Sequence, residues 1–188
     1  QCINNLKQIG IGFLNHESTH GFLPCAGLSG YYVGDPLLGA GSDQPGSWIY
    51  QVLPYVEQQA VYNLTGDGDK AGITANQKQQ SIVLQSTPIS GFNCPSRRPP
   101  QRYPYMLSTA WTPRNGDIAR ETGVARSDYA ANSGDGERGM DPWDVSSQQY
   151  IPVRTKSEWV FYSNYGGSSE NAYPFDGQTG INYAGAEI

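Results

Sequence analysis

The sequence predicts an α+β fold in which an N-terminal α-helix packs on an antiparallel β-sheet with long loops. Three observations predict it. A helical pattern of apolar residues occupies residues 2–19, and strand-like segments dominate the second half of the chain. The 188 residues include 23 Gly, 13 Pro and 13 Tyr, while only 15% are charged. This composition is typical of many turns and short strands, and this length is typical of a single domain.

The N-terminal helix is expected from about Cys2 to Thr19, because apolar residues there recur at intervals of three and four and so share one helical face. Gly21 and Pro24 supply the stop signal that follows. We expect this helix, residues 1–20 of the chain, to pack on the sheet through Ile3, Leu6, Ile9 and Phe13.

Residues 21–95 are expected to form a loop and a helical insertion. A second helix is predicted from about Ser47 to Asn63, and Pro54 should kink or divide it because proline cannot donate the backbone hydrogen bond that a helix interior needs. A third helix is predicted over 76–87, followed by a short strand over 89–94.

Residues 96–188 are expected to form a β-rich body. Clusters of Gly, Pro, Asn and Asp separate its strand-like segments, as turns do in β structure. The predicted strands cover residues 103–111, 127–131, 159–162 and 178–183.

Composition and charge exclude some partners. The formal net charge is −5 and no Lys/Arg stripe is present, so the electrostatic footprint of nucleic-acid binding is missing. The basic cluster of Arg97, Arg98 and Arg102 is interpreted as part of a solvated loop. No apolar run reaches the roughly 18 residues of a membrane span. The chain opens with Gln1 directly in a helical pattern and stops on strand-like residues, so we expect that both ends have been cut.

The three cysteines, Cys2, Cys25 and Cys94, have no C-x-x-C spacing, which excludes a zinc ribbon or a thioredoxin motif. An odd count leaves two alternatives open from the residues alone. One is a single disulfide with one free thiol, as in an exported protein, and the other is three reduced thiols.

Five strings resemble, in this order, a large bacterial family of unknown function whose members carry a prepilin-type cleavage and methylation signal. They cover residues 2–10 (CINNLKQIG), 21–24 (GFLP), 48 with 53–59 and 62–63 (W, LPYVEQQ, YN), 92–96 (FNCPS) and 127–132 (SDYAAN). This family looks like the pseudopilins of type II secretion, in which a long helix with a hydrophobic first half precedes a globular head.

The resemblance implies a non-enzymatic pilin-like subunit, associated with a filament or with secretion, with residues 1–188 as its single head. It implies a periplasmic or cell-surface location, with tethering to the inner membrane by a hydrophobic half-helix upstream of Gln1 and a further region after Ile188. Its partners would be copies of itself or other pilin-like subunits, without nucleic acid or a cofactor. Cys2 and Cys94 lie in family strings and Cys25 does not, so the resemblance favours a Cys2–Cys94 disulfide and a free Cys25.

An alternative function is a zinc metallopeptidase, because His16-Glu-Ser-Thr-His20 matches the H-E-x-x-H pattern. That chemistry needs two imidazoles one helical turn apart, a Glu as general base and a third ligand. The chain contains only these two histidines, so Glu57 on the second helix is the one sensible substitute for a third. The motif also lies in the last helical turn before Gly21, and we favour a plain polar helix end with no catalytic residue.

A calcium site is the better metal hypothesis. The Gly-rich segment after Asn132 contains Asp135, Glu137 and Asp141, and calcium takes six to eight oxygen ligands from flexible loops of this kind. Asp128 and Asp144 flank the segment. The spacing does not match an EF-hand, and a solvated acidic loop is the simpler interpretation.

A second alternative function is an extracellular head that binds a carbohydrate or another solute. Aromatic rings can stack on sugars, although such rings more often belong to a core or a strand surface. The candidate rings are Trp111, Trp143 and Trp159.

Overall fold

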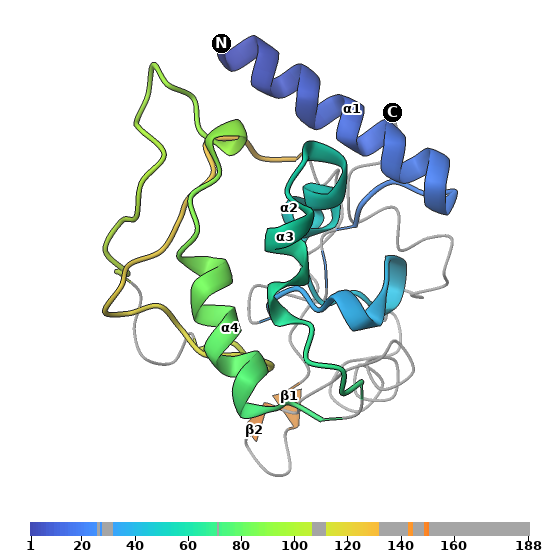
Figure 1. The fold of residues 1–188 in the computed structure, drawn as a ribbon, viewed down its shortest axis with the longest axis vertical. Helices are drawn as coiled ribbons and strands as arrows, with labels where there is room; N and C mark the ends of the chain where they lie inside the picture. Colours follow the sequence, from blue (N-terminus) through green and yellow to red (C-terminus); the bar gives the residue numbers. More distant parts are fainter. Residues whose placement is uncertain are drawn as a thin grey trace.

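The computed structural model describes residues 1–25, 27, 32–70, 72–106, 112–131, 143–144 and 149–150. These residues form helices joined by irregular segments (Figure 1). The α-helices are α1 (Cys2–His20), α2 (Trp48–Val52), α3 (Gln59–Tyr62) and α4 (Ala75–Gln85). The 3-10 helices are η1 (Pro36–Leu38), η2 (Gly41–Asp43), η3 (Leu53–Val56), η4 (Asn63–Thr65) and η5 (Ser90–Phe92).

Helix α1 has the predicted bounds to within one residue, because its stop signal is local. Gly21 adopts a left-handed conformation with φ of 81°, and its N–H donates to the carbonyl of Glu17. A residue with a Cβ is strained at that φ, so glycine is suited to ending the helix there. None of the helices in the described ranges is both long and apolar enough to cross a membrane.

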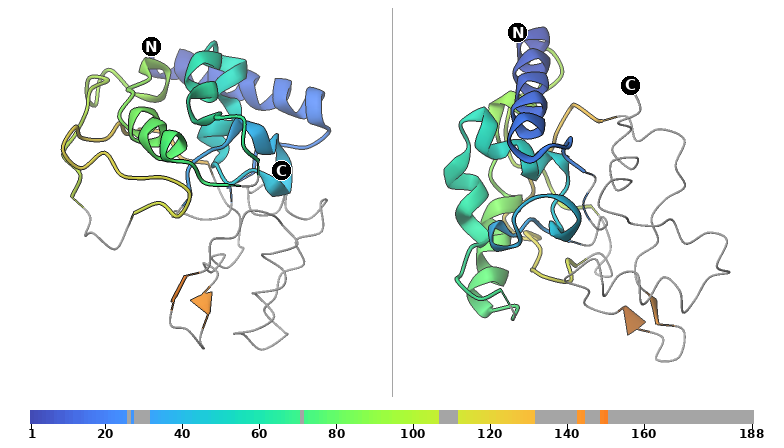
Figure 2. Two further views of the ribbon diagram at one scale, coloured as in Figure 1. Left: turned by 60° about the horizontal axis from the view of Figure 1, so that its bottom comes forward. Right: turned by 90° about the vertical axis from the view of Figure 1, so that its right-hand side faces the viewer.

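The predicted packing of this helix on an antiparallel sheet is wrong. Helix α1 contacts α2, η3 and η5, and the described residues contain no sheet beneath it. Figures 1 and 2 show α1 along one edge of the described fold. The strands in the described part are β1 (Trp143–Asp144) and β2 (Gln149–Tyr150), which pair antiparallel with each other over two residues each. A helix-on-helix arrangement therefore replaces the expected α+β fold in this part of the chain.

The segment predicted as a strand over 89–94 forms η5 instead. The N–H of Phe92 donates to the carbonyl of Ile89, and the N–H of Asn93 donates to that of Ser90. These local bonds close a 3-10 turn and use backbone groups that a β-ladder would need.

The second and third predicted helices are present, and Pro54 divides the second one as predicted. Helix α2 gives way to η3 at Leu53, and Glu57 then takes a left-handed conformation with φ of 62° before α3 begins. Helix α4 starts one residue before its predicted position because Thr74 caps it: the N–H of Gln77 donates to the Thr74 hydroxyl at 3.0 Å.

The β-rich body is not seen where the structure describes residues 96–131. Tyr103 and Val124 form one isolated antiparallel bridge. Residues 127–131 form no strand, because the hydroxyl of Ser127 bonds both the N–H and the carbonyl of Tyr129 in a local turn. The predicted strands over 159–162 and 178–183, and residues 107–111 of another, lie outside the described residues.

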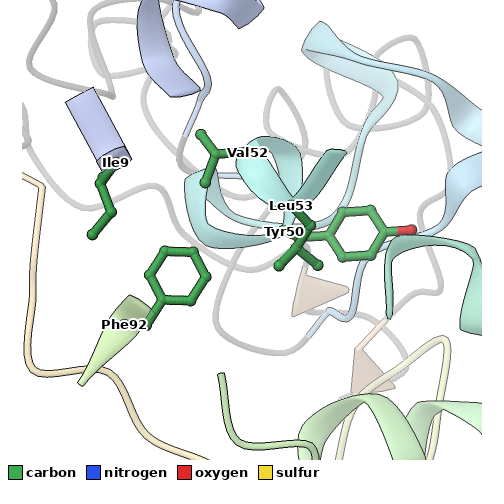
Figure 3. Packing of buried hydrophobic residues seen from close by; sticks show 5 residues of the cluster. All are labelled: Ile9, Tyr50, Val52, Leu53 and Phe92. Atoms are coloured by element: carbon green, nitrogen blue, oxygen red, sulfur yellow. The ribbon is translucent and has the colours of Figure 1, made fainter. Parts of the chain in front are cut away.

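The apolar core forms where α1, the α2–η3 region and η5 meet. The core contains one residue of α1, three residues of α2 and η3, and one aromatic ring of η5. Segments far apart in sequence therefore share one cluster (Figure 3). The buried members are Ile9, Tyr50, Val52, Leu53 and Phe92.

Candidate functional site

Only half of the residues predicted to form the buried face of α1 pack inward. Ile9 is buried, and the Phe13 ring lies 5.5 Å from the Trp48 ring, centroid to centroid. Ile3 and Leu6, which we expected to pack inward, are 70% and 51% exposed. At Gly12 a Cβ would come within 3.2 Å of Val56 Cγ1, so glycine lets α1 approach η3 closely.

The first turn of α1 is held by a set of contacts that we call the α1 junction, formed by Cys2, Asn5, Asn93, Cys94, Asp128 and Tyr129. Cys2 and Cys94 form a disulfide with their Cα atoms 5.0 Å apart. Cys25 is a free, half-buried thiol whose sulfur lies 3.0 Å from Nε2 of Gln51. The structure thus contains the pairing that the family resemblance implied.

Two hydrogen bonds of the junction reinforce the disulfide. The side-chain amide of Asn5 donates to the carbonyl of Asn93 at 2.8 Å. The hydroxyl of Tyr129 donates to the carbonyl of Cys2 at 3.3 Å. Because both acceptors are backbone atoms, these bonds set the position of the helix start relative to η5 and to residue 129.

Asp128 organises the other side of the junction. Its side chain is 1% exposed; its Oδ2 accepts the N–H of Cys94 at 2.9 Å, and its Oδ1 pairs with Arg98 at 2.6 Å and with Arg97 at 3.3 Å. Burial acts to raise the pKa of the Asp128 carboxyl, but the Cys94 N–H and the two guanidiniums outweigh it and lower that pKa. The interpretation of Arg97 and Arg98 as solvated loop residues is therefore wrong for Arg98, whose side chain is mostly buried.

Three of the five family strings meet at this junction, although they lie far apart in the chain. Residues 2–10 supply Cys2 and Asn5, residues 92–96 supply Asn93 and Cys94, and residues 127–132 supply Asp128 and Tyr129. Neither Asn5 nor Tyr129 is singled out by the residues alone, and Asp128 is expected there to flank a calcium loop. The one sequence signal for Asn5, Asp128 and Tyr129 is that all three lie in the family strings.

The H-E-x-x-H motif is built into a packed cluster of rings. His16 is 1% exposed, and its Nδ1 donates to the carbonyl of Phe22 at 2.9 Å, since a carbonyl can only accept. Its Nε2 is buried and has no hydrogen-bond partner among the residues that the structure describes. The rings of His20, Phe22 and Tyr55 lie 4.5, 5.5 and 5.7 Å from the His16 ring, centroid to centroid.

Of the predicted zinc set, the His20 ring packs against His16, but the two carboxylates do not join them. Glu17 and Glu57 are both exposed, and Nε2 of His20 lies 3.0 Å from the hydroxyl of Tyr55. Within the described ranges, no three His, Cys, Asp or Glu side chains are grouped so that they could hold a metal ion. Asp135, Glu137 and Asp141 lie outside the described residues, so the calcium site stays a prediction.

The stability of the protein should depend on pH through His16. Burial lowers the pKa of the His16 imidazole, the bond to Phe22 opposes this, and the neighbouring His20 adds to the lowering. In the unfolded chain a histidine binds a proton near pH 6.5, whereas folded His16 stays neutral to lower pH. The unfolded state then binds more protons, so stability is full above about pH 6.5 and falls as the pH drops toward the folded pKa.

Urea unfolding at pH 7.5 and pH 5.5 measures this effect. We expect the loss of stability on acidification to shrink in His16→Asn, which keeps a neutral donor near Phe22. It should persist for the most part in the control His20→Asn, because His20 is the smallest of the causes that shift the His16 pKa. An unchanged pH dependence in His16→Asn would contradict the assignment.

The comparisons with known proteins give one family. A family described as protein of unknown function (DUF1559) matches residues 1–170. No curated protein matches the chain, and neither does any solved structure.

Proposed function

We propose that this chain, which belongs to the DUF1559 family of proteins of unknown function, is the head of a non-enzymatic pilin-like subunit. In this proposal the head lies in the periplasm or at the cell surface. A hydrophobic half-helix, following a prepilin-type signal, continues α1 upstream and tethers the subunit to the inner membrane. The five strings that resemble pseudopilin-like proteins support this part of the proposal.

The observation that carries the proposal is an uncovered apolar stripe on α1, formed by Ile3, Leu6 and Leu14. These side chains are 70%, 51% and 62% exposed. At 100° per residue, these three positions span about 80° of the helix circumference, next to the face of α1 that packs against the rest of the protein. Exposed apolar residues are ordinary when scattered, but a row of them along one helix typically marks a surface for a partner.

The partner that fits this stripe is the corresponding helix of a second pilin-like subunit. The α1 junction fixes the first turn of the helix on one side, so the stripe keeps a defined orientation on the head. An apolar helix upstream of residue 1 would continue the same surface toward the membrane. A subunit built in this way contributes by packing and presenting a surface, which requires no active site.

The arrangement of the H-E-x-x-H motif favours a packing role over the peptidase alternative. In a zinc peptidase, the histidine nitrogens bind a zinc ion that holds a water molecule at an open position. The His16 ring is instead enclosed by three other rings. The tryptophans of the carbohydrate-binding alternative, Trp111, Trp143 and Trp159, fall where the structure describes no side chains.

Cross-linking in the bacterium of origin tests the proposed contact. The full-length subunit would carry Cys25→Ser together with Leu14→Cys on the stripe or, as the matched control, Asn15→Cys, an exposed position about 100° around α1 from Leu14. Mild oxidation should yield covalent dimers from Leu14→Cys and monomers from Asn15→Cys. Dimers from both variants, or from neither, would count against the stripe as the contact.

A further inference from the structure

A hollow of about 230 Å³ opens beside the apolar core. It lies between α2, η3 and α3 on one side and the end of α4, η5 and residues 125–127 on the other. An apolar protein cavity of about 150 Å³ is large enough to take up benzene, so this one has room for a two-ring body or a short alkyl chain. Its apolar lining includes Ile49, Leu53, Val61, Leu84, Ile89 and Phe92.

Among the described residues that line this hollow, one carries a charge, and that charge is positive. Arg126 lines the hollow and is an exposed residue. Its guanidinium stacks on the Tyr103 ring at 5.3 Å, and its Nη2 donates to the carbonyl of Pro104 at 3.2 Å. Where the structure describes side chains, no carboxylate pairs with Arg126, in contrast to Arg97 and Arg98, which share Asp128.

The described lining residues therefore combine an apolar interior with one cation that pairs with no described carboxylate, and with small polar residues such as Ser47. None of the hollow's described lining residues is Asp or Glu. A ligand that is apolar at one end and negatively charged at the other matches both features, because its body leaves water while its charge stays beside a guanidinium.

We propose that this hollow binds a small amphipathic acid, with an aromatic or aliphatic body of about ten carbons between α2 and α4 and its carboxylate toward Arg126. This site lies apart from the α1 stripe, and the proposal does not depend on assembly of the protein.

Calorimetric titration of the purified protein with 2-naphthoate tests the proposal, with 2-naphthalenemethanol as the uncharged ligand of the same shape. We expect saturable binding of one naphthoate per chain, and weaker binding of the alcohol. Arg126→Gln should lower the naphthoate affinity about three- to fivefold, the scale of a solvent-exposed ion pair, and leave the alcohol unaffected. Lys70→Gln removes a positive charge outside the lining and should change neither affinity.

Leu84→Trp should fill the hollow and abolish the binding of both ligands. Val61→Phe serves the same purpose if the first variant does not fold, and circular dichroism establishes folding in each case. An absence of saturable naphthoate binding by the unmodified protein, binding that survives in a folded filled variant, or an equal loss in Lys70→Gln would overturn the proposal.

Discussion

Replacing Cys2 and Cys94 by serine is expected to lower the free energy of unfolding by about 4 kcal/mol. The disulfide joins residues separated by 92 positions, and a cross-link that closes so long a loop restricts the unfolded chain strongly. The hydrogen bonds of Asn5 and Tyr129 remain in the variant, so α1 should still dock, with its first turn held more weakly.

Urea unfolding of the unreduced protein measures this loss, with Cys25→Ser as the control. That substitution removes the free thiol and its contact with Gln51, and we expect it to cost no more than about 1 kcal/mol. Addition of a reductant should destabilise the unmodified protein and leave the double variant unchanged. A double variant as stable as the unmodified protein would show that this bridge does not stabilise the head.

The local features of the fold could be predicted from the sequence because their causes are local. Helix α1 ends where Gly21 takes a left-handed conformation, and the second helix divides at Pro54 because proline lacks an N–H. Helix α4 begins after Thr74, whose hydroxyl caps it, although the prediction of a helix there rests on a mixed pattern of polar and apolar residues and not on the cap.

The packing of these elements could not be predicted in the same way. Apolar residues occupy two adjacent faces of α1. Periodicity alone does not indicate which of these faces packs against the rest of the chain. Ile9 packs into the core while Ile3 and Leu6 stay exposed, so the pattern that predicted one face actually combined two. Within the described residues, the strand expected over 127–131 is absent because the Ser127 hydroxyl bonds the backbone of Tyr129 in a local turn.

The α1 junction depends on contacts between residues far apart in sequence. Asp128 binds the N–H of Cys94 and the guanidinium of Arg98, and nothing near Asp128 in the sequence indicates these partners. In the sequence alone, Asp128 resembles the other acidic residues in and beside the Gly-rich segment. The ordered family strings implied the disulfide, but they did not show that the three strings meet in one place.

Making the apolar stripe polar is expected to reduce assembly of the full-length subunit strongly without destabilising the head. Leu6 and Leu14 are 51% and 62% exposed, so a partner would bury about half of each side chain. Full burial of a leucine contributes about 1.5–3 kcal/mol, and the two half-burials together contribute roughly 2 kcal/mol. Leu6→Ser with Leu14→Ser should therefore weaken each contact between subunits about thirtyfold.

The matched control is Gln8→Ser with Asn15→Ser, which makes the same number of substitutions at exposed positions of α1 outside the stripe. Surface substitutions of either kind should change the free energy of unfolding by no more than about 0.5 kcal/mol. Any difference in assembly between the two double variants then reflects the surface and not the fold.

The most direct test of the stripe as the contact between subunits is the fraction of the full-length protein that sediments as higher-order assemblies after gentle membrane solubilisation. We predict assemblies for the unmodified subunit and for the Gln8→Ser, Asn15→Ser control, and dispersed subunits for Leu6→Ser, Leu14→Ser. Equal sedimentation of the two double variants would contradict the account.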